Sequence, residues 1–134
     1  MSLSDNTTQP IDVAVESIYQ PVYSKPLEDL YVFAYRIVIT NHGTLPAKLL
    51  RRHWVVTDAT GQVREVEGEG VVGQQPTILP GQYHEYVSWI QLATPIGTME
   101  GDFTMESSSI DDLGRTEFKA EIPRFTHVAP ELFN

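Results

Sequence analysis

Residues 31–40 read YVFAYRIVIT, a run in which apolar or aromatic side chains fall on both alternating faces. Arg36 is the charged exception within this run. A strand that is apolar on both faces is typical of the middle of a sheet, and β-branched and aromatic residues favour the extended conformation. The run therefore predicts the central strand of a β core.

Strands with one buried face are predicted nearer the C-terminus. In residues 99–106 (MEGDFTME) apolar residues and glycine alternate with polar residues, and residues 117–122 (EFKAEI) repeat this two-residue period. Further strands are predicted at 11–20, 48–57, 62–68, 75–79 and 83–92. No segment has the 3.6-residue apolar period of a crossover helix, so hairpins and loops must join the strands. The sequence therefore predicts an all-β fold, an antiparallel sandwich of seven to eight strands.

The 134-residue chain has the length of a single domain, which we expect to span residues 11–125. A flexible N-terminal tail, 1–10, and a C-terminal tail, 126–134, are expected on either side.

The formal net charge of −9 argues against binding to nucleic acid or to an anionic membrane. The chain has no cysteine, and its first ten residues lack the basic start and apolar run of a signal peptide. We therefore expect a cytoplasmic protein.

Residues 68–73 read GEGVVG, the G-x-G-x-x-G spacing of dinucleotide-binding folds. That motif needs a helix directly after it, whereas here the sequence QQPTILPG follows, with two prolines. A dinucleotide site is therefore excluded. Two interpretations stay open: a bend in the sheet, which is favoured, or an anion-binding nest of backbone amides.

Two arginines precede the glycine stretch on the neighbouring strand of a predicted hairpin. A four-residue loop would place Arg52 opposite Glu67, and a two-residue turn would place it opposite Glu69. Either register gives Arg52 a carboxylate for a cross-strand ion pair. Arg51 would then lie on the other face of the strand, beside Gly68 or Gly70, where it could support an anion site.

Metal and catalytic sites are not indicated. Glu65, Glu67 and Glu69 share one face of a strand, but successive positions on that face are about 6.6 Å apart, which suggests a solvated acidic edge. The four histidines are scattered without ligand spacing, and Asp111 and Asp112 form at most a weak loop site for a divalent ion. No G-x-S-x-G motif surrounds a serine, so we expect no enzyme and no cofactor.

Six large aromatic residues are assigned to the core of the sandwich or to a tyrosine corner. An aromatic binding platform is the less favoured interpretation. The residues are Tyr31, Tyr35, Trp54, Tyr83, Tyr86 and Trp89.

Three segments together resemble the ApaG family of small bacterial proteins: R-H-W at 52–54, G-E-G-V-V-G at 68–73 and T-P-I-G-T-M-E-G at 94–101. The resemblance covers about residues 11–125 and implies a fibronectin type III or immunoglobulin-like sandwich in a bacterial cytoplasmic protein. It also implies a link with cobalt resistance and magnesium efflux, the CorD designation. Neither cobalt resistance nor magnesium efflux assigns a chemical activity to the protein.

Two functions follow as hypotheses. The first is a protein-interaction module with an unidentified protein partner, because the family's domain also occurs as an appendage of larger proteins. The alternative is a small-ligand sensor that weakly binds a phosphorylated metabolite or a divalent cation through the glycine stretch. The chain is expected to be a monomer or a homodimer. The candidate anion-binding or partner-binding residues are Gly68, Gly70, Gly73, Arg51, Arg52 and His53.

Overall fold

The computed structural model describes residues 10–108 and 114–130, most of which lie in strands. Two short 3-10 helices, η1 (Pro21–Tyr23) and η2 (Pro26–Glu28), lie between the first two strands. Neither is long and apolar enough to cross a membrane, nor is any other helix in the described ranges. The strands are β1 (Ile11–Tyr19), β2 (Tyr31–Asn41), β3 (Ala47–Asp58), β4 (Val63–Glu69), β5 (Thr77–Ile78), β6 (Tyr83–Leu92), β7 (Ile96–Ser108) and β8 (Arg115–Val128).

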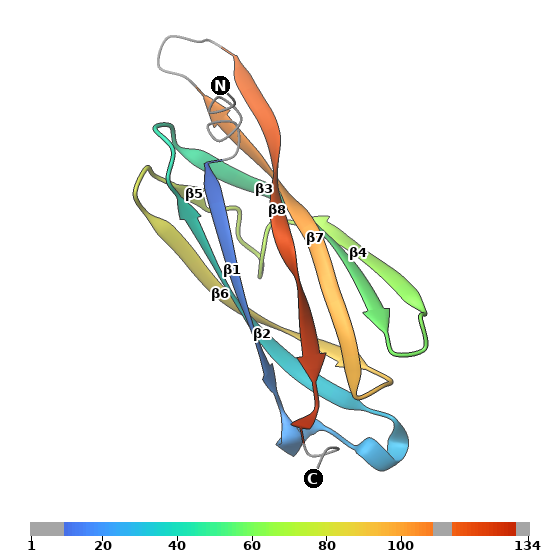
Figure 1. The fold of residues 1–134 in the computed structure, drawn as a ribbon. Coiled ribbons are helices and arrows are strands. Elements are labelled where there is room, and N and C mark those ends of the chain that lie inside the picture. The colour runs from blue at the N-terminus through green and yellow to red at the C-terminus, as the bar shows by residue number, and fades with distance from the viewer. Residues whose placement is uncertain (1–9, 109–113, 131–134) are drawn as a thin grey trace, which may run out of the picture.

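The strands form two layers (Figure 1). The smaller sheet has the order β1-β2-β6, and the larger has the order β4-β3-β7-β8, with β5 pairing with the start of β3. Every pairing between these strands is antiparallel. The predicted antiparallel sandwich of the immunoglobulin or fibronectin type III-like class is therefore confirmed, with eight strands in the described residues.

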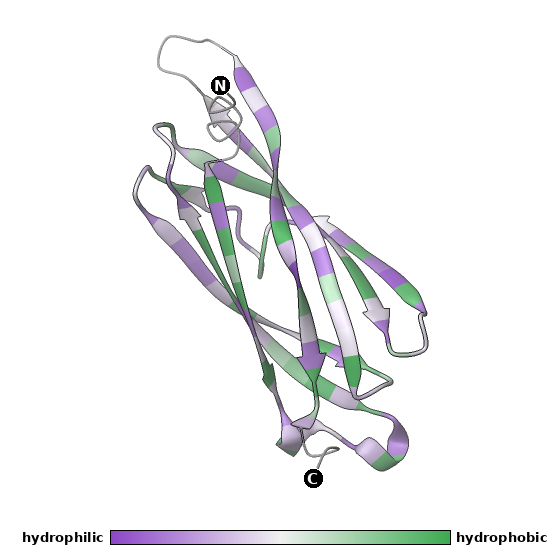
Figure 2. Ribbon diagram, in the orientation of Figure 1, coloured by the Kyte–Doolittle hydropathy of each residue, from purple (hydrophilic) through white to green (hydrophobic). Residues whose placement is uncertain are grey.

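The core lies between the two sheets. β2 is the middle strand of the smaller sheet, as the YVFAYRIVIT run predicts, and Phe33, Ile37 and Ile39 are fully buried. The first half of β2 is buried on both faces, whereas Arg36 and later outward side chains are partly exposed. In Figure 2 hydrophilic and hydrophobic segments alternate along the strands of the larger sheet, as expected of a sheet with one face in the core.

A β-bulge in β3 decides which side chains face the core. Leu49 pairs with Met105 and Arg51 pairs with Thr104, so Leu50 is an extra residue in β3. Such an extra residue reverses the alternation of side chains along the strand. Arg52 therefore points toward the interior with Trp54, which is buried, while Arg51 points outward.

The last strand continues beyond the expected domain boundary at residue 125. Residues 126–128 pair with 96–98, and His127 is fully buried, so these residues belong to the sandwich. Residues 1–9 and 131–134 of the expected tails lie outside the described residues.

The assignment of the six aromatic residues to the core or to a tyrosine corner was wrong for Trp89, and Tyr83, a candidate for the corner, is not a core residue. Trp89 is 50% exposed and Tyr83 is 65% exposed. Both point outward from β6, where Trp89 pairs with Ala34 on β2. The other four aromatic residues, Tyr31, Tyr35, Trp54 and Tyr86, are buried as predicted.

Candidate functional site

The β3–β4 hairpin brings the candidate residues together in a register that the sequence did not predict. Thr57 pairs with Val63, and residues 59–61 form a three-residue loop. Gly61 donates its amide to the Asp58 carbonyl at 3.0 Å and has a φ of 88°, as this loop type requires of its last residue. Arg52 consequently pairs with Gly68. Both predicted registers, and the ion pair of Arg52 with a strand glutamate, were therefore wrong.

Arg52 ties the end of β4 to β3 from the inner face of the sheet. Its Nη1 donates to the carbonyl oxygens of Glu69 at 3.1 Å and Gly70 at 2.9 Å. A Cβ atom on Gly68 would lie 2.7 Å from the guanidinium nitrogens, so the glycine leaves room for the arginine. Burial raises the pKa of both Tyr35 and Tyr86, and the charge of Arg52 partly offsets this shift in each.

The rest of the glycine stretch forms a tight turn. Gly70 has a φ of 65°, and a Cβ there would lie 2.3 Å from the Gln74 carbonyl oxygen. Val72 and Gly73 both have positive φ, at 49° and 77°, and the amide and carbonyl of Val71 pair with those of Gln74. This geometry is a type I′ turn. A tight bend of the chain, the favoured interpretation, accounts for Gly70 and Gly73, whereas Gly68 lies within β4, where it leaves room for Arg52.

Two amides that an anion-binding nest would need are engaged within the protein. Gly70 donates to the Leu50 carbonyl at 2.8 Å, and Val71 donates to Gln74 at 2.8 Å. A nest binds an anion with successive amides that point into one concavity. Because the amides of Gly70 and Val71 are already hydrogen-bonded, they argue against a phosphate-binding site in the glycine stretch.

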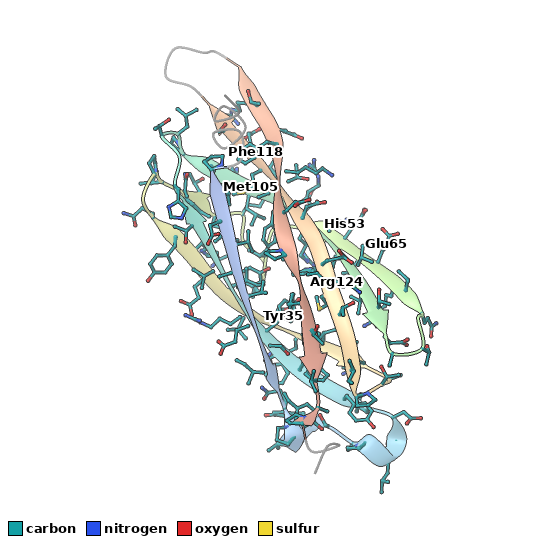
Figure 3. All side chains as sticks on the ribbon, viewed as in Figure 1. Tyr35, His53, Glu65, Met105, Phe118 and Arg124 are labelled. Atoms are coloured by element: carbon teal, nitrogen blue, oxygen red, sulfur yellow. The ribbon has the colours of Figure 1, made fainter. Side chains whose placement is uncertain are left out.

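Arg51 and His53 lie on the opposite, outer face of the larger sheet. Arg51 forms an exposed ion pair with Glu117 on β8, with 3.3 Å between Nη2 and Oε1. His53 Nε2 lies 2.7 Å from an oxygen of Glu65 and 3.8 Å from an oxygen of Glu67. Figure 3 shows His53 and Glu65 close together at the β3–β4 hairpin. The six candidate residues are thus not gathered in one place: Arg51 and His53 lie on the outer face of the sheet, Arg52 meets Gly68 on the inner face, and Gly70 and Gly73 lie in the turn after β4.

A shallow hollow of about 760 Å³ lies at this part of the larger sheet, lined mainly by residues of its outer face and also by Arg52, Gly68 and Phe118. Five carboxylates line it, against two arginines and one lysine, so the hollow carries an excess of negative charge. Such a surface attracts cations and repels phosphates. The carboxylates are those of Glu65, Glu67, Glu69, Asp102 and Glu117, and the bases are Arg51, Arg52 and Lys119.

Sequence reasoning missed the group formed by His53, Glu65 and Glu67. In a three-residue loop register, His53 stands directly opposite Glu67 and diagonally opposite Glu65, so the loop length was the signal that could have revealed it. Asp111 and Asp112, the other candidate for a divalent ion, lie outside the described residues.

A second surface, formed by Ile18, Tyr23, Val87 and Trp89, lies on the outer face of the smaller sheet. We call it the Trp89 surface. Ile18 and Trp89 both pair with Ala34, so they lie in one row across the sheet. Tyr23 packs edge-on against Trp89, with 5.3 Å between ring centroids. All four side chains of the Trp89 surface are exposed.

Comparisons of both sequence and structure match this chain to proteins that carry the name ApaG or ApaA. The family model described as ApaG domain matches residues 21–107. A protein named Protein ApaG from Thiobacillus denitrificans is 47% identical over 92% of this chain and 94% of its own length. The Protein ApaG of Azotobacter vinelandii is also 47% identical, over 87% of this chain and 94% of its own. A crystal structure from Bordetella pertussis that carries the name ApaA superposes with a TM-score of 0.83 at 41% identity, covering 91% of this chain and 97% of that one.

Proposed function

The chain belongs to the ApaG domain family, and from this premise we propose that it is a non-catalytic protein-interaction module that binds its partner through the Trp89 surface. The proposal includes a bacterial cytoplasmic location and a monomeric or homodimeric state. The link of the family with cobalt resistance and magnesium efflux would then act through the partner protein.

The observation that carries this proposal is the exposure of Trp89. Half of this large side chain is in contact with solvent, and Tyr23, 60% exposed, packs edge-on against it. Exposed aromatic residues that gather with aliphatic ones are rare on a surface that contacts only water. Tryptophan and tyrosine are also the residues that contribute most to binding when a partner covers them.

The position of β6 supports the same conclusion. Within the described residues β6 pairs only with β2, so its other edge is open to another strand except at Gln91, whose carbonyl accepts a hydrogen bond from Arg64 Nη2 at 3.0 Å. An open edge offers backbone groups to an extended segment of another protein, and alternate side chains of that segment would reach the Trp89 surface. A shallow groove of about 750 Å³ lies here, lined by Tyr23, Val32, Arg64, Trp89, Ile90 and Gln91.

Trp89→Ala tests the proposal. The protein would first be used to capture partners from extract of its host bacterium, and the affinity of each purified partner would then be measured by calorimetry. We expect the substitution to weaken binding about thirtyfold, which corresponds to the loss of about 2 kcal/mol typical of a binding hot spot. Because Trp89 is half exposed, the variant should remain folded, as its melting curve would verify.

Arg51→Ala is the matched control, since Arg51 is exposed on the outer face of the opposite sheet. Its affinity for the partner should equal that of the unchanged protein. If Arg51→Ala weakens binding and Trp89→Ala does not, the proposed surface is the wrong one.

The alternative function, a sensor of a phosphorylated metabolite or a divalent cation that binds through the glycine stretch, finds less support for its phosphorylated ligand. The amides of Gly70 and Val71 are engaged, and the nearby hollow is rich in carboxylates. This alternative requires that pyrophosphate or diadenosine tetraphosphate shift the amide signals of residues 68–73 in NMR spectra. Unchanged signals at millimolar ligand would exclude it.

A further inference from the structure

The outer face of the larger sheet places three metal-ligand side chains within reach of one another. One atom each of His53, Glu65 and Glu67 lies within 4.8 Å of the other two. The imidazole comes from β3 and both carboxylates come from β4, its hairpin partner. We propose that these three side chains form a binding site for a divalent transition-metal ion such as Zn²⁺, independent of the Trp89 surface on the other sheet.

The spacing suits such an ion. Zinc bonds of about 2.0–2.2 Å in a tetrahedral arrangement place neighbouring ligand atoms somewhat more than 3 Å apart. The two measured distances from His53 Nε2, 2.7 Å to Glu65 and 3.8 Å to Glu67, lie on either side of that value. Both glutamates are exposed, so small rotations of their side chains are enough to enclose an ion, and water would complete the coordination.

The donor set determines which metal fits. An imidazole nitrogen is a good ligand for zinc, nickel and copper, whereas magnesium and calcium prefer oxygen ligands alone. A group of one histidine and two carboxylates therefore selects a transition metal over Mg²⁺. The spacing of about 6.6 Å expected between two glutamates on one strand face does not apply to their carboxylate oxygens, because an oxygen of Glu65 and an oxygen of Glu67 lie within 4.8 Å of each other and of a ring nitrogen of His53.

The electrostatic surroundings favour a cation as well. In the cross-strand register, His53 stands between Glu67 on β4 and Asp102 on β7, and Asp102 pairs with Glu121 on β8. Asp102 Oδ1 is buried and accepts no hydrogen bond from the residues that the structure describes; Lys119 Nζ lies 3.8 Å away. In this row one carboxylate lies on each side of His53 and a third lies one strand further, and a divalent cation at His53 reduces the repulsion between them.

The test titrates Zn²⁺ and, separately, Mg²⁺ into protein freed of metal with a chelator. NMR spectra would follow the ring signals of the histidines, and melting curves would follow stability. We expect Zn²⁺ to shift the His53 signals and to raise the melting temperature, because an ion that binds the folded state alone stabilises it. Mg²⁺ at the same concentration should do neither.

Three variants remove one ligand each: His53→Gln, Glu65→Gln and Glu67→Gln. Loss of an outer-shell partner already weakens metal sites about 10- to 100-fold, so each of these should lose about 100-fold in affinity for Zn²⁺. Glu69→Gln is the matched control, because Glu69 is the next outward glutamate on β4 and its loss removes the same charge. It should bind Zn²⁺ as the unchanged protein does.

Three results would overturn the proposal: Glu69→Gln weakens Zn²⁺ binding as much as Glu67→Gln; Zn²⁺ shifts His42 or His84 in place of His53; or Mg²⁺ binds as tightly as Zn²⁺. The first would mean general attraction to an acidic face, and the others would mean a different site or a different ion. Because the three ligand side chains lie at the surface, all variants should fold, and their circular dichroism spectra would verify this.

Discussion

Val72 occupies a backbone conformation that its side chain does not favour. Its φ is 49°, in the left-handed region, and its β-branched side chain is exposed to solvent. An ordinary residue in this region costs about 1 kcal/mol or more, and the cost is highest for β-branched residues. The type I′ turn at 71–74 prefers Asn-Gly at its centre, and Gly73 already occupies the second position.

We predict that Val72→Asn stabilises the protein by about 1 kcal/mol, because asparagine accepts the left-handed conformation. Urea unfolding followed by fluorescence measures the change. Val63→Asn serves as the control, since Val63 is equally exposed but lies in β4, where the loss of a β-branched residue should lower stability. A Val72→Asn variant that unfolds at lower urea than the unchanged protein would show that the turn is not strained.

At the scale of elements, the two adjacent arginines have different roles. Arg52 binds two carbonyl oxygens at the end of β4 from the inner face, whereas Arg51 forms an exposed ion pair with Glu117. Hydrogen bonds from a charged donor contribute about 1.5–3 kcal/mol, and exposed ion pairs contribute about 1 kcal/mol or less. Removal of one arginine should therefore matter far more than removal of the other.

We predict that Arg52→Ala lowers the free energy of unfolding by about 2 kcal/mol, while Arg51→Ala lowers it by less than about 1 kcal/mol. Chemical denaturation of both variants under one set of conditions measures the difference. The amide signals of residues 68–73 should also broaden in Arg52→Ala alone. Equal losses in the two variants would mean that Arg52 does not hold the turn.

The strands were predictable because their signals are local. The apolar run at 31–40 and the two-residue period at 99–106 report directly which faces are buried, and both agree with the structure except at Thr104, a polar position that is buried. The site was less predictable because it depends on the register in which β3 pairs with β4. One loop residue decides whether Arg52 faces a carboxylate or Gly68, and the bulge at Leu50 leaves no mark in the sequence pattern.

At the scale of the whole molecule, the contacts between the two sheets could not be predicted from the sequence. β1 and β8 are edge strands of different sheets, and they lie next to each other at one side of the sandwich (Figure 1). His127 on β8 forms a hydrogen bond with Ser17 on β1, with 2.6 Å between Nδ1 and Oγ. The pairing of residues 110 positions apart has no local signal, and the C-terminal boundary was therefore placed before His127.

His127 makes the stability of the sandwich depend on pH. Its ring is fully buried against Phe33 and Phe125, and Nε2 lies 3.1 Å from Met99 Sδ. Burial disfavours the charged form and lowers the pKa of the imidazole to about 4, against 6.5 in an unfolded chain. Between these values the unfolded state binds the proton and the folded state does not.

The direction of the pH dependence follows from this difference in pKa between the folded and unfolded states. The contribution of His127 to stability is fully present above pH 6.5 and is lost as the pH falls toward 4, with a total on the order of 3 kcal/mol. We predict that the urea midpoint falls between pH 6.5 and 5, before most carboxylates are protonated. In His127→Asn, which keeps a polar group near Ser17 but does not titrate, the midpoint should change much less over this range. If the urea midpoint changes with pH to the same extent in both proteins, the pH dependence arises elsewhere in the chain. Protonation of His127 would then not be what destabilises the sandwich.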